Sequence, residues 1–318
     1  MNTFAFLFPG QGAQAVGMLN GFAGNAAVAH TVAEASDALG LDLARLIADG
    51  PKEALDLTTN TQPVMLTAAV AVYRAWIAAG GPVPAMVAGH SLGEYSALVA
   101  AGVIRFADAV PLVRFRAQAM QDAVPVGQGG MAVILGLDAD AVRAVCLAAA
   151  ALDAGSVVEP VNFNEPTQIV IAGHTGAVER ACELAKAAGA KRAMKLAVSA
   201  PFHSSLLQPA SDRLRSYLAD LTFSAPSIAL LNNVDVAVTS DAHAIKDALV
   251  RQAASPVRWV ETMQVMAEGG ICQVIECAPS KVLVGMAKRI DARLVGESLL
   301  DQASLERVLD ALGRADQA

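Results

Sequence analysis

The chain has 318 residues, of which 54% are hydrophobic, and a formal net charge of −7. This length fits one large α/β domain or a main domain with a smaller companion, and the negative charge argues against nucleic acid as a partner. The four cysteines do not have the spacing of a disulfide scaffold or of a zinc site, so we expect free thiols and no metal.

No apolar stretch is long enough to predict a membrane span. The most apolar runs, Met65–Val72 and Ala97–Ile104, are interrupted by Tyr73, Arg74 and Arg105 well before the ~20 residues that a spanning helix needs. The N-terminal sequence lacks the basic region and the cleavage site of a signal peptide. We therefore expect a cytoplasmic protein without a membrane partner.

Short apolar runs that favour strands alternate along the chain with longer alanine- and leucine-rich runs of helical period. This alternation predicts an α/β fold in which helices cover the faces of a parallel sheet. The expected strands are Phe4–Phe8, Met86–Gly89, Ile228–Leu231, Gln273–Glu276 and Ala292–Val295. The expected helices are Gln62–Ala79, Ser91–Ala101, Phe106–Ala123, Ser205–Leu218, Ala242–Gln252, Val260–Glu268 and Ser304–Leu312.

The middle of the chain breaks this pattern after a turn-rich segment at residues 124–130. Four short strands and two helices follow in the order β-α-β-β-α-β, which is typical of the ferredoxin-like fold. The strands are Met131–Leu135, Val157–Asn162, Gln168–Ala172 and Lys191–Leu196, and the helices are Ala139–Ala150 and Thr175–Ala188. We predict a small ferredoxin-like domain over residues 125–197, inserted into a large α/β-hydrolase-like domain over residues 1–124 and 198–318.

The segment Gly89-His-Ser-Leu-Gly93 fits the pattern G-x-S-x-G between an expected strand and an expected helix, which is the context of a nucleophile elbow. The two glycines would allow the backbones to approach closely. The helix N-terminus would offer free N–H groups to developing negative charge. Taken alone, the pattern fits Ser91 either as a nucleophile or as a helix N-cap between turn glycines.

A nucleophilic serine needs a base, and the chain has five histidines. His90 adjoins Ser91, so on a tight turn its side chain would point away from the position of a base. His203 is the better candidate, in a loop where the chain returns to the large domain, although a loop histidine can also be a surface residue. No aspartate between Ser91 and His203 lies at an expected strand end, which favours a backbone carbonyl as the group that orients the imidazole.

The glycine-rich loop that follows the first strand can be interpreted in three ways. Its spacing fits a dinucleotide fingerprint, but the alanine-rich, helix-like segment at residues 20–48 lacks the second strand and the acid that this fingerprint needs. It can also be an oxyanion loop, in which the N–H of Gln11 joins that of Leu92. The third interpretation is a tight turn.

Two arginines, Arg114 and Arg116, lie on different faces of the expected helix Phe106–Ala123, so one of them should point inward. A guanidinium in a cleft is suited to bind a substrate carboxylate with two hydrogen bonds. The alternative is a surface arginine that extends along an amphipathic helix.

Six segments of the chain form a collinear set. They are Phe8-Pro-Gly-Gln-Gly12, Gly89-His-Ser-Leu-Gly-Glu-Tyr95, Arg116, Pro160-Val-Asn-Phe-Asn164, Ala200-Pro-Phe-His203 and Gln252-Ala-Ala-Ser-Pro-Val257. Together they resemble the malonyl-CoA:acyl-carrier-protein transacylase family of fatty acid synthesis. The resemblance extends from the first strand to about Gly296, and a set of six is far more specific than any one member.

The resemblance implies a role for each of these positions. Ser91 would carry the malonyl group as an ester, His203 would be its base and Arg116 would pair with the malonyl carboxylate. The N–H groups of Gln11 and Leu92 would bind the oxyanion.

Two further positions follow from the same resemblance. The backbone carbonyl of Gln252 would orient His203, which accounts for the absence of a third carboxylate. Phe202 resembles the pattern of malonyl-selective relatives, since its ring leaves little room for an α-methyl group.

The implied reaction is a ping-pong transfer that needs no metal and no bound cofactor. Its partners would be malonyl-CoA and acyl carrier protein, and because carrier proteins are acidic we expect docking at Lys191, Arg192, Lys195 or Lys281. Three alternatives share the sequence pattern: malonyl loading for a polyketide pathway or a malonate decarboxylase, a serine esterase of related fold, and a pseudo-enzyme that binds carrier protein without turnover.

Overall fold

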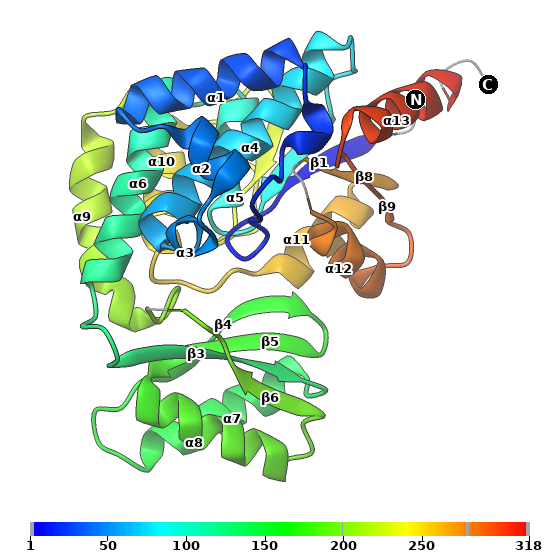
Figure 1. The fold of residues 1–318 in the computed structure, drawn as a ribbon. Helices are drawn as coiled ribbons and strands as arrows, with labels where there is room; N and C mark the ends of the chain where they lie inside the picture. Colours follow the sequence, from blue (N-terminus) through cyan, green and yellow to red (C-terminus); the bar gives the residue numbers. More distant parts are fainter. Residues whose placement is uncertain (1–2, 199, 278–279, 316–318) are drawn as a thin grey trace.

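Five parallel strands form the central sheet of the upper body in Figure 1. The computed structural model describes residues 3–198, 200–277 and 280–315. In spatial order the strands are β7 (Ala229–Leu231), β2 (Met86–Gly89), β1 (Phe4–Phe8), β8 (Gln273–Glu276) and β9 (Val295–Ser298). Every neighbouring pair is parallel. The carboxyl ends of the strands therefore meet at one edge of the sheet, where α/β proteins place their sites.

Helices cover both faces of this sheet. The side chains of β1 alternate between the two faces: Phe6 and Phe8 pack in one apolar core with Trp76, whereas Leu7 packs in a second core with Trp259. The helices are α1 (Ala26–Leu39), α2 (Leu43–Asp49), α3 (Lys52–Leu55), α4 (Thr58–Ala78), α5 (Gly93–Ala100), α6 (Phe106–Asp122), α9 (Gln208–Ala219), α10 (Ala242–Gln252), α11 (Trp259–Glu268), α12 (Val282–Ile290) and α13 (Gln302–Ala315), with short 3₁₀ turns η1 (Asn20–Phe22) and η2 (Ser205–Leu207).

Side-chain caps fix where several helices begin. Asn25 accepts backbone hydrogen bonds at the start of α1, and Asp241 does so at the start of α10. Such caps stabilise a helix by about 1 kcal/mol because they satisfy N–H groups that have no partner within the helix. None of the helices in the described part of the chain is long and apolar enough to cross a membrane.

The middle of the chain forms a second, four-stranded antiparallel sheet. Its elements are β3 (Gly129–Leu135), α7 (Ala139–Ala151), β4 (Val158–Glu165), β5 (Gln168–His174), α8 (Thr175–Ala187) and β6 (Arg192–Lys195), and the strand order is β4-β5-β3-β6. Helices α7 and α8 cover the face that is turned away from the large body (Figure 1).

Strand β4 connects the two bodies. The N–H of Val257, which follows α10, donates to the carbonyl of Val161 at 2.8 Å, and the N–H of Phe163 donates to the carbonyl of Val257 at 3.0 Å. At the end of β4, Glu165 forms an ion pair with Arg289 of α12. The small sheet is thus attached to the large body by backbone and ionic contacts.

The predicted α/β fold, with a parallel sheet and a small antiparallel companion, is confirmed. Strands β1, β2 and β8 coincide with the predicted ranges. The prediction for the last strand is wrong, because the strand runs over Val295–Ser298 instead of Ala292–Val295. A turn occupies the earlier residues, in which the N–H of Leu294 donates to the carbonyl of Asp291 at 3.1 Å. The small sheet spans residues 129–195, and the domain boundaries next to residues 125 and 197 stay predictions.

Candidate active site

Ser91 lies in the tight turn between β2 and α5. Its φ of 53° is in the left-handed region, which costs a serine about 1–3 kcal/mol. A Cβ on Gly89 would lie 1.9 Å from the carbonyl carbon of Gly93, and a Cβ on Gly93 would lie 1.9 Å from the carbonyl oxygen of Phe8. The predicted close approach of the backbones is confirmed. Because the φ of Ser91 is not helical, α5 begins at Gly93 instead of at Ser91.

The fold brings His203 to Ser91 across 112 residues of sequence, with 2.7 Å between Nε2 and Oγ. His203 is 3% exposed, and its φ is 66°, also left-handed. The turn that holds it is closed by Ser204, whose Oγ donates to the carbonyl of Pro201 at 2.8 Å. Both members of this pair are thus held in strained backbone positions by the surrounding fold.

A backbone carbonyl determines the proton position on the imidazole. Nδ1 of His203 lies 2.8 Å from the carbonyl oxygen of Gln252. Since a carbonyl oxygen only accepts hydrogen bonds, Nδ1 carries the hydrogen, and the lone pair of Nε2 faces the hydroxyl of Ser91. The contact expected between Gln252 and His203 is therefore present in the structure.

The pKa of His203 is lowered to about 3. Burial is the main cause, and the positive charge of Arg116 is the second, whereas the carbonyl of Gln252 acts in the opposite direction. The imidazole is therefore neutral at neutral pH and can accept a proton, but burial and, to a smaller extent, the charge of Arg116 make it a weak base.

Arg116 is the inward-pointing arginine of α6, and it is 1% exposed. One Nη donates to Gln62 Oε1 at 2.9 Å, and the other donates to Gln252 Oε1 at 2.9 Å and to Ser91 Oγ at 3.2 Å. Its partners are neutral oxygens, and within the described residues Arg116 forms no ion pair. A buried cation with neutral partners next to a hydroxyl suits an anionic ligand.

The loop after β1 lies against the elbow. A Cβ on Gly10 would lie 2.6 Å from the carbonyl oxygen of His90, and Gln11 Oε1 accepts a hydrogen bond from Gln62 Nε2 at 3.2 Å. Within the described part of the chain, neither the N–H of Gln11 nor that of Leu92 donates a hydrogen bond. Both donors are thus available, and their joint role at an oxyanion stays a prediction.

The ring of His90 has partners other than Ser91. Its Nε2 lies 2.8 Å from Asn164 Oδ1 on β4, and the ring packs edge-on against Trp259. This arrangement agrees with the expectation that His90 points away from the position of the base.

Four polar residues of the site received no individual role from the sequence, although two of them lie in the segments that carry the resemblance: Gln62, Glu94, Asn164 and Asn233. Asn233 holds the elbow, since its Oδ1 accepts from the N–H of Ser91 and its Nδ2 donates to the carbonyl of Gly89, both at 2.7 Å. Its position just after β7 was an available signal, because polar residues at the carboxyl ends of parallel strands often line a site.

Comparison with known proteins agrees with the fold. A family model described as acyl transferase domain matches residues 5–312. The malonyl CoA-acyl carrier protein transacylase of Salmonella typhimurium is 53% identical over 310 residues, which are 97% of this chain and 99% of the relative.

Solved structures give the same result. An acyl-carrier-protein S-malonyltransferase from Burkholderia pseudomallei has a TM-score of 0.95 and 66% identity, over 97% of this chain and 99% of that one. A malonyl-transacylase solved in complex with a type II polyketide synthase acyl-carrier protein has a TM-score of 0.95 and 49% identity, with the same coverage. This chain belongs to the acyl transferase family and, within it, to the malonyl-CoA:acyl-carrier-protein transacylases.

Proposed function

We propose that the protein moves the malonyl group of malonyl-CoA to the phosphopantetheine thiol of acyl carrier protein in fatty acid synthesis, through an ester on Ser91. The observation that carries this proposal is the buried guanidinium of Arg116, whose Nη2 lies 3.2 Å from Ser91 Oγ. An esterase for neutral esters would leave this guanidinium without a directly paired carboxylate, whereas the free carboxylate of a malonyl group supplies one.

The first half-reaction forms the ester. Nε2 of His203 takes the proton of the Ser91 hydroxyl while its oxygen attacks the thioester carbon. The N–H groups of Gln11 and Leu92 donate to the oxyanion of the tetrahedral intermediate, and each such donor contributes about 10²–10³ in rate. The carbon–sulfur bond then breaks, and the CoA sulfur takes the proton from His203.

The second half-reaction runs the same steps with a new thiol. The carrier's thiol gives its proton to His203 and attacks the malonyl ester. The carbon–oxygen bond breaks, and the proton returns to the oxygen of Ser91. Throughout, the carbonyl of Gln252 holds the hydrogen on Nδ1, so that Nε2 alone exchanges protons.

The malonyl carboxylate has a second effect in this scheme. Arg116 is one of the causes that lower the pKa of His203. When the carboxylate pairs with Arg116, it offsets that positive charge, and the imidazole becomes a stronger base. An acetyl group brings no such charge, so selectivity for malonyl has a rate component as well as a binding component.

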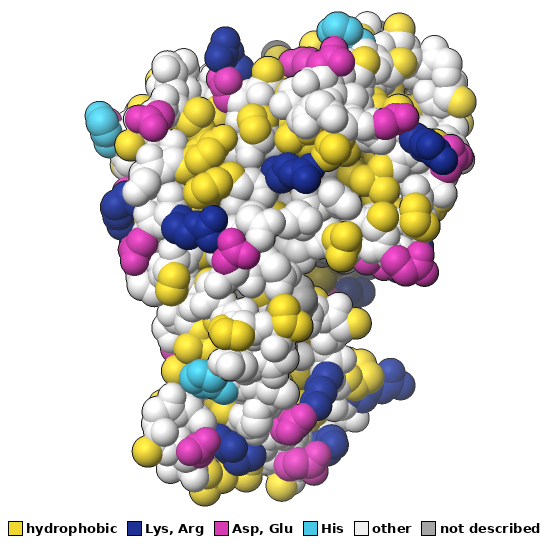
Figure 2. Space-filling view, turned by 60° about the vertical axis from the view of Figure 1, so that its left-hand side comes forward, with side chains coloured by type: hydrophobic (Ala, Val, Ile, Leu, Met, Phe, Trp, Pro, Cys, Tyr) yellow, Lys and Arg dark blue, Asp and Glu magenta, His cyan; other side chains and the backbone are white. Residues whose placement is uncertain are grey.

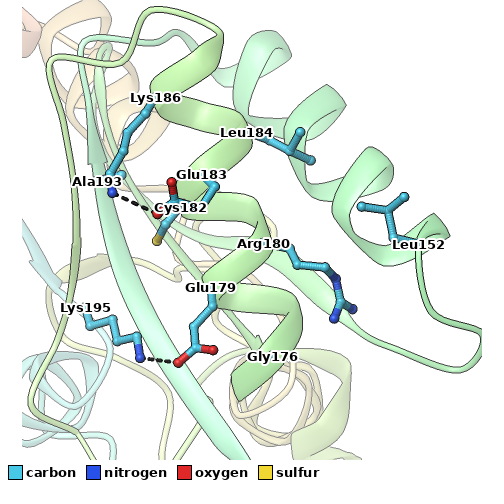
Figure 3. Close-up of a pocket in the computed structure, with 10 residues that line it drawn as sticks. All are labelled: Leu152, Gly176, Glu179, Arg180, Cys182, Glu183, Leu184, Lys186, Ala193 and Lys195. Carbon is cyan, nitrogen blue, oxygen red and sulfur yellow. Dashed lines mark hydrogen bonds and ion pairs between the residues drawn. The ribbon is translucent and has the colours of Figure 1, made fainter.

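Docking of the carrier protein is proposed at exposed cations. Figure 2 shows Lys and Arg side chains interspersed with Asp and Glu on the lower body, which contains the small sheet. Lys195, one of the four cations expected to dock the carrier, is paired with Glu179. It lines a hollow of about 730 Å³ on α8 and β6, together with the pair Lys186–Glu183 (Figure 3). These paired cations are largely neutralised.

The other three expected cations, Lys191, Arg192 and Lys281, are exposed. Within the described residues no carboxylate lies within ion-pair distance of any of them. We therefore assign docking of an acidic carrier to these three residues, because unpaired charges steer association more strongly than paired ones.

The proposed function is tested by mixing the protein separately with malonyl-CoA and acetyl-CoA and measuring adducts by intact-protein mass spectrometry. We expect a malonyl adduct that is lost in Ser91→Ala, and that transfers to acyl carrier protein when this is added. Ser216→Ala, on the exposed face of α9, is the control that keeps the adduct. Equal adducts from both thioesters, or an adduct that survives in Ser91→Ala, would contradict the mechanism.

The Arg116→Ala variant tests the origin of selectivity. Its kcat/KM for malonyl loading should fall by about 30-fold or more, because truncation of one partner of a buried charge pair costs about 2–5 kcal/mol. Acetyl loading should fall much less. Arg114→Ala, on another face of the same helix, is the matched control. Equal losses for the two acyl groups would show that Arg116 is structural.

One observation favours a second acceptor. The malonyl-transacylase that was solved with a polyketide synthase carrier is 49% identical to this chain over nearly its whole length. Transfer to a carrier of that kind is therefore the second candidate, with the same chemistry at Ser91. Comparing the rates of transfer from the malonyl-protein to a fatty acid carrier and to a polyketide carrier separates the two.

A further inference from the structure

A buried carboxylate lies directly behind the elbow, and the mechanism above gives it no role. Glu94, in the first turn of α5, is 1% exposed. Its Oε2 accepts hydrogen bonds from Nε2 of Gln252 at 2.9 Å and from the N–H of Asn233 at 3.0 Å. Because a buried carboxylate is costly even when it is hydrogen-bonded, its place at this site requires an explanation.

Both partners of this carboxylate hold parts of the active site. The side chain of Gln252 accepts a hydrogen bond from Arg116 and donates one to the carbonyl of Ser91, and its backbone carbonyl faces His203. The side chain of Asn233 accepts from the N–H of Ser91. Glu94 therefore contacts the two residues that connect the nucleophile, the base and the guanidinium.

The carboxylate also determines the direction of the Gln252 amide. An ionised carboxylate only accepts hydrogen bonds, and a guanidinium only donates them. Gln252 must therefore turn its NH₂ group toward Glu94 and its oxygen toward Arg116, as observed. A flipped amide would place its oxygen against the carboxylate and its NH₂ against the guanidinium, so the carboxylate and the guanidinium fix one orientation between them.

The charges around Glu94 can be assigned to the elements that pack on α5. Arg116 of α6 and Asp235 after β7 both act on the carboxyl group, and Tyr95 is the titratable neighbour on α5 itself. Strands β1 and β2 contain no charged residue, and the one charged residue of α4, Arg74, pairs with Glu34.

Burial and these charges together place the titration of Glu94 near neutral pH. Burial, the main cause, raises the pKa of Glu94 to about 7, while the hydrogen bonds from Gln252 and Asn233 and the charge of Arg116 act to lower it. His203 stays neutral in the same range, because its pKa is about 3.

On the basis of the proposed function, we propose that Glu94 is a positioning residue for the malonyl group: its ionised carboxylate fixes the side chain of Gln252 and, through it, aims the guanidinium of Arg116 at the acyl group on Ser91. Protonation of Glu94 turns the acceptor into a group that can also donate, so that only Arg116 and the carbonyl of Ser91 still orient Gln252, and its side chain is held less firmly. Malonyl loading should therefore rise with pH as Glu94 ionises, and acetyl loading, which does not use Arg116, should not.

The experiment measures kcat/KM for loading of both acyl groups from about pH 5.5 to about pH 8.5. Glu94→Gln keeps the shape of the side chain and removes its charge. Its malonyl loading should fall by about 10- to 100-fold, as expected for loss of a buried hydrogen bond to a charged group, and should no longer vary with pH near 7. Glu94→Asp keeps the charge and should recover part of the rate and of the pH dependence. Glu53→Gln, on the exposed surface of α3, is the matched control.

Three outcomes would overturn the positioning role. They are a wild-type malonyl profile without a rise near pH 7, a Glu94→Gln profile that keeps this rise, and equal losses of malonyl and acetyl loading in Glu94→Gln. The first can be measured even if the variants do not fold. Failure of the proposed function itself would look different, because the wild-type protein would then form no malonyl ester on Ser91.

Discussion

Two buried glutamates flank the central strand of the large sheet, and they have different neighbours. Glu94 follows β2, and Glu276 ends β8; both strands pair with β1. Burial raises the pKa of each carboxyl group. The two regions thus bury the same side chain at the same edge of one sheet.

The difference lies in what donates to each carboxylate. Glu276 accepts hydrogen bonds from the N–H groups of Leu283 and Val284, in the first turn of α12, and from the hydroxyl of Ser280. It therefore caps a helix. Glu94 accepts instead from Gln252 and Asn233, which contact Ser91, His203 and Arg116. Burial alone does not distinguish a structural carboxylate from a functional one. The distinction lies in the other contacts that its hydrogen-bond donors make.

The largest expected effect is a loss in the free energy of unfolding, caused by a substitution next to Glu94. In Gly93→Ala the new Cβ would lie 1.9 Å from the carbonyl oxygen of Phe8. That oxygen belongs to the backbone of the central strand, so relief requires β1 or the elbow to move. We expect a loss of more than about 3 kcal/mol in the free energy of unfolding, at or beyond the upper end of overpacking costs. Urea unfolding measures this loss, and a change below about 1 kcal/mol would contradict the close approach.

A smaller effect follows from the titration of Glu94. Below its ordinary pKa of 4.5 the carboxyl group is protonated in both the folded and the unfolded chain, and above about 7 it is ionised in both. Between these values only the unfolded chain has released the proton, so the wild-type protein loses stability as pH rises. The total loss is about 3 kcal/mol, and it should be absent from Glu94→Gln.

Urea unfolding of both proteins across this pH range measures the difference. A constant difference between wild type and Glu94→Gln would show that burial does not shift this group. Glu276→Gln sharpens the comparison. The difference in the free energy of unfolding between wild type and Glu276→Gln should change with pH in the same direction as it does for Glu94→Gln. Its ratio of malonyl to acetyl loading should equal that of the wild type. A changed ratio in Glu276→Gln would remove the distinction between the two regions.

The large sheet was predictable because its central strands are short apolar runs bounded by turn residues, as in Phe4–Phe8 and Gln273–Glu276. The strand at Val295–Ser298 was misplaced because it lies at the edge of the sheet, where Val295 is 61% exposed. An edge strand pairs on one side only, so its apolar content does not determine where it begins. Here the turn at Asp291 determines where the strand begins.

With the exception of Arg116, the site was predictable where its residues belong to contiguous motifs and not where they stand alone in the sequence. Ser91 and His203 lie in recognisable segments, and the structure places them 2.7 Å apart. Asn233 and Gln62 each stand alone in the sequence, and their partners are 142 and 54 residues away. Glu94 lies within the elbow motif, but nothing in its neighbours reveals that its carboxylate contacts Gln252, because that contact depends on how α10 packs.

The smallest expected effect is a change in the free energy of unfolding caused by a substitution in α12, next to Glu276. Gly285 lies within α12, and a Cβ there would meet nothing closer than the guanidinium of Arg289, at 3.8 Å. Gly285→Ala should therefore stabilise the protein by about 0.5–1 kcal/mol, because alanine loses less backbone entropy than glycine in a helix. Thermal unfolding measures the gain, and malonyl loading should be unchanged. If Gly285→Ala instead destabilised the protein as Gly93→Ala is expected to, close backbone packing would be common to both regions, and the rigidity of the elbow could no longer be attributed to the demands of the site.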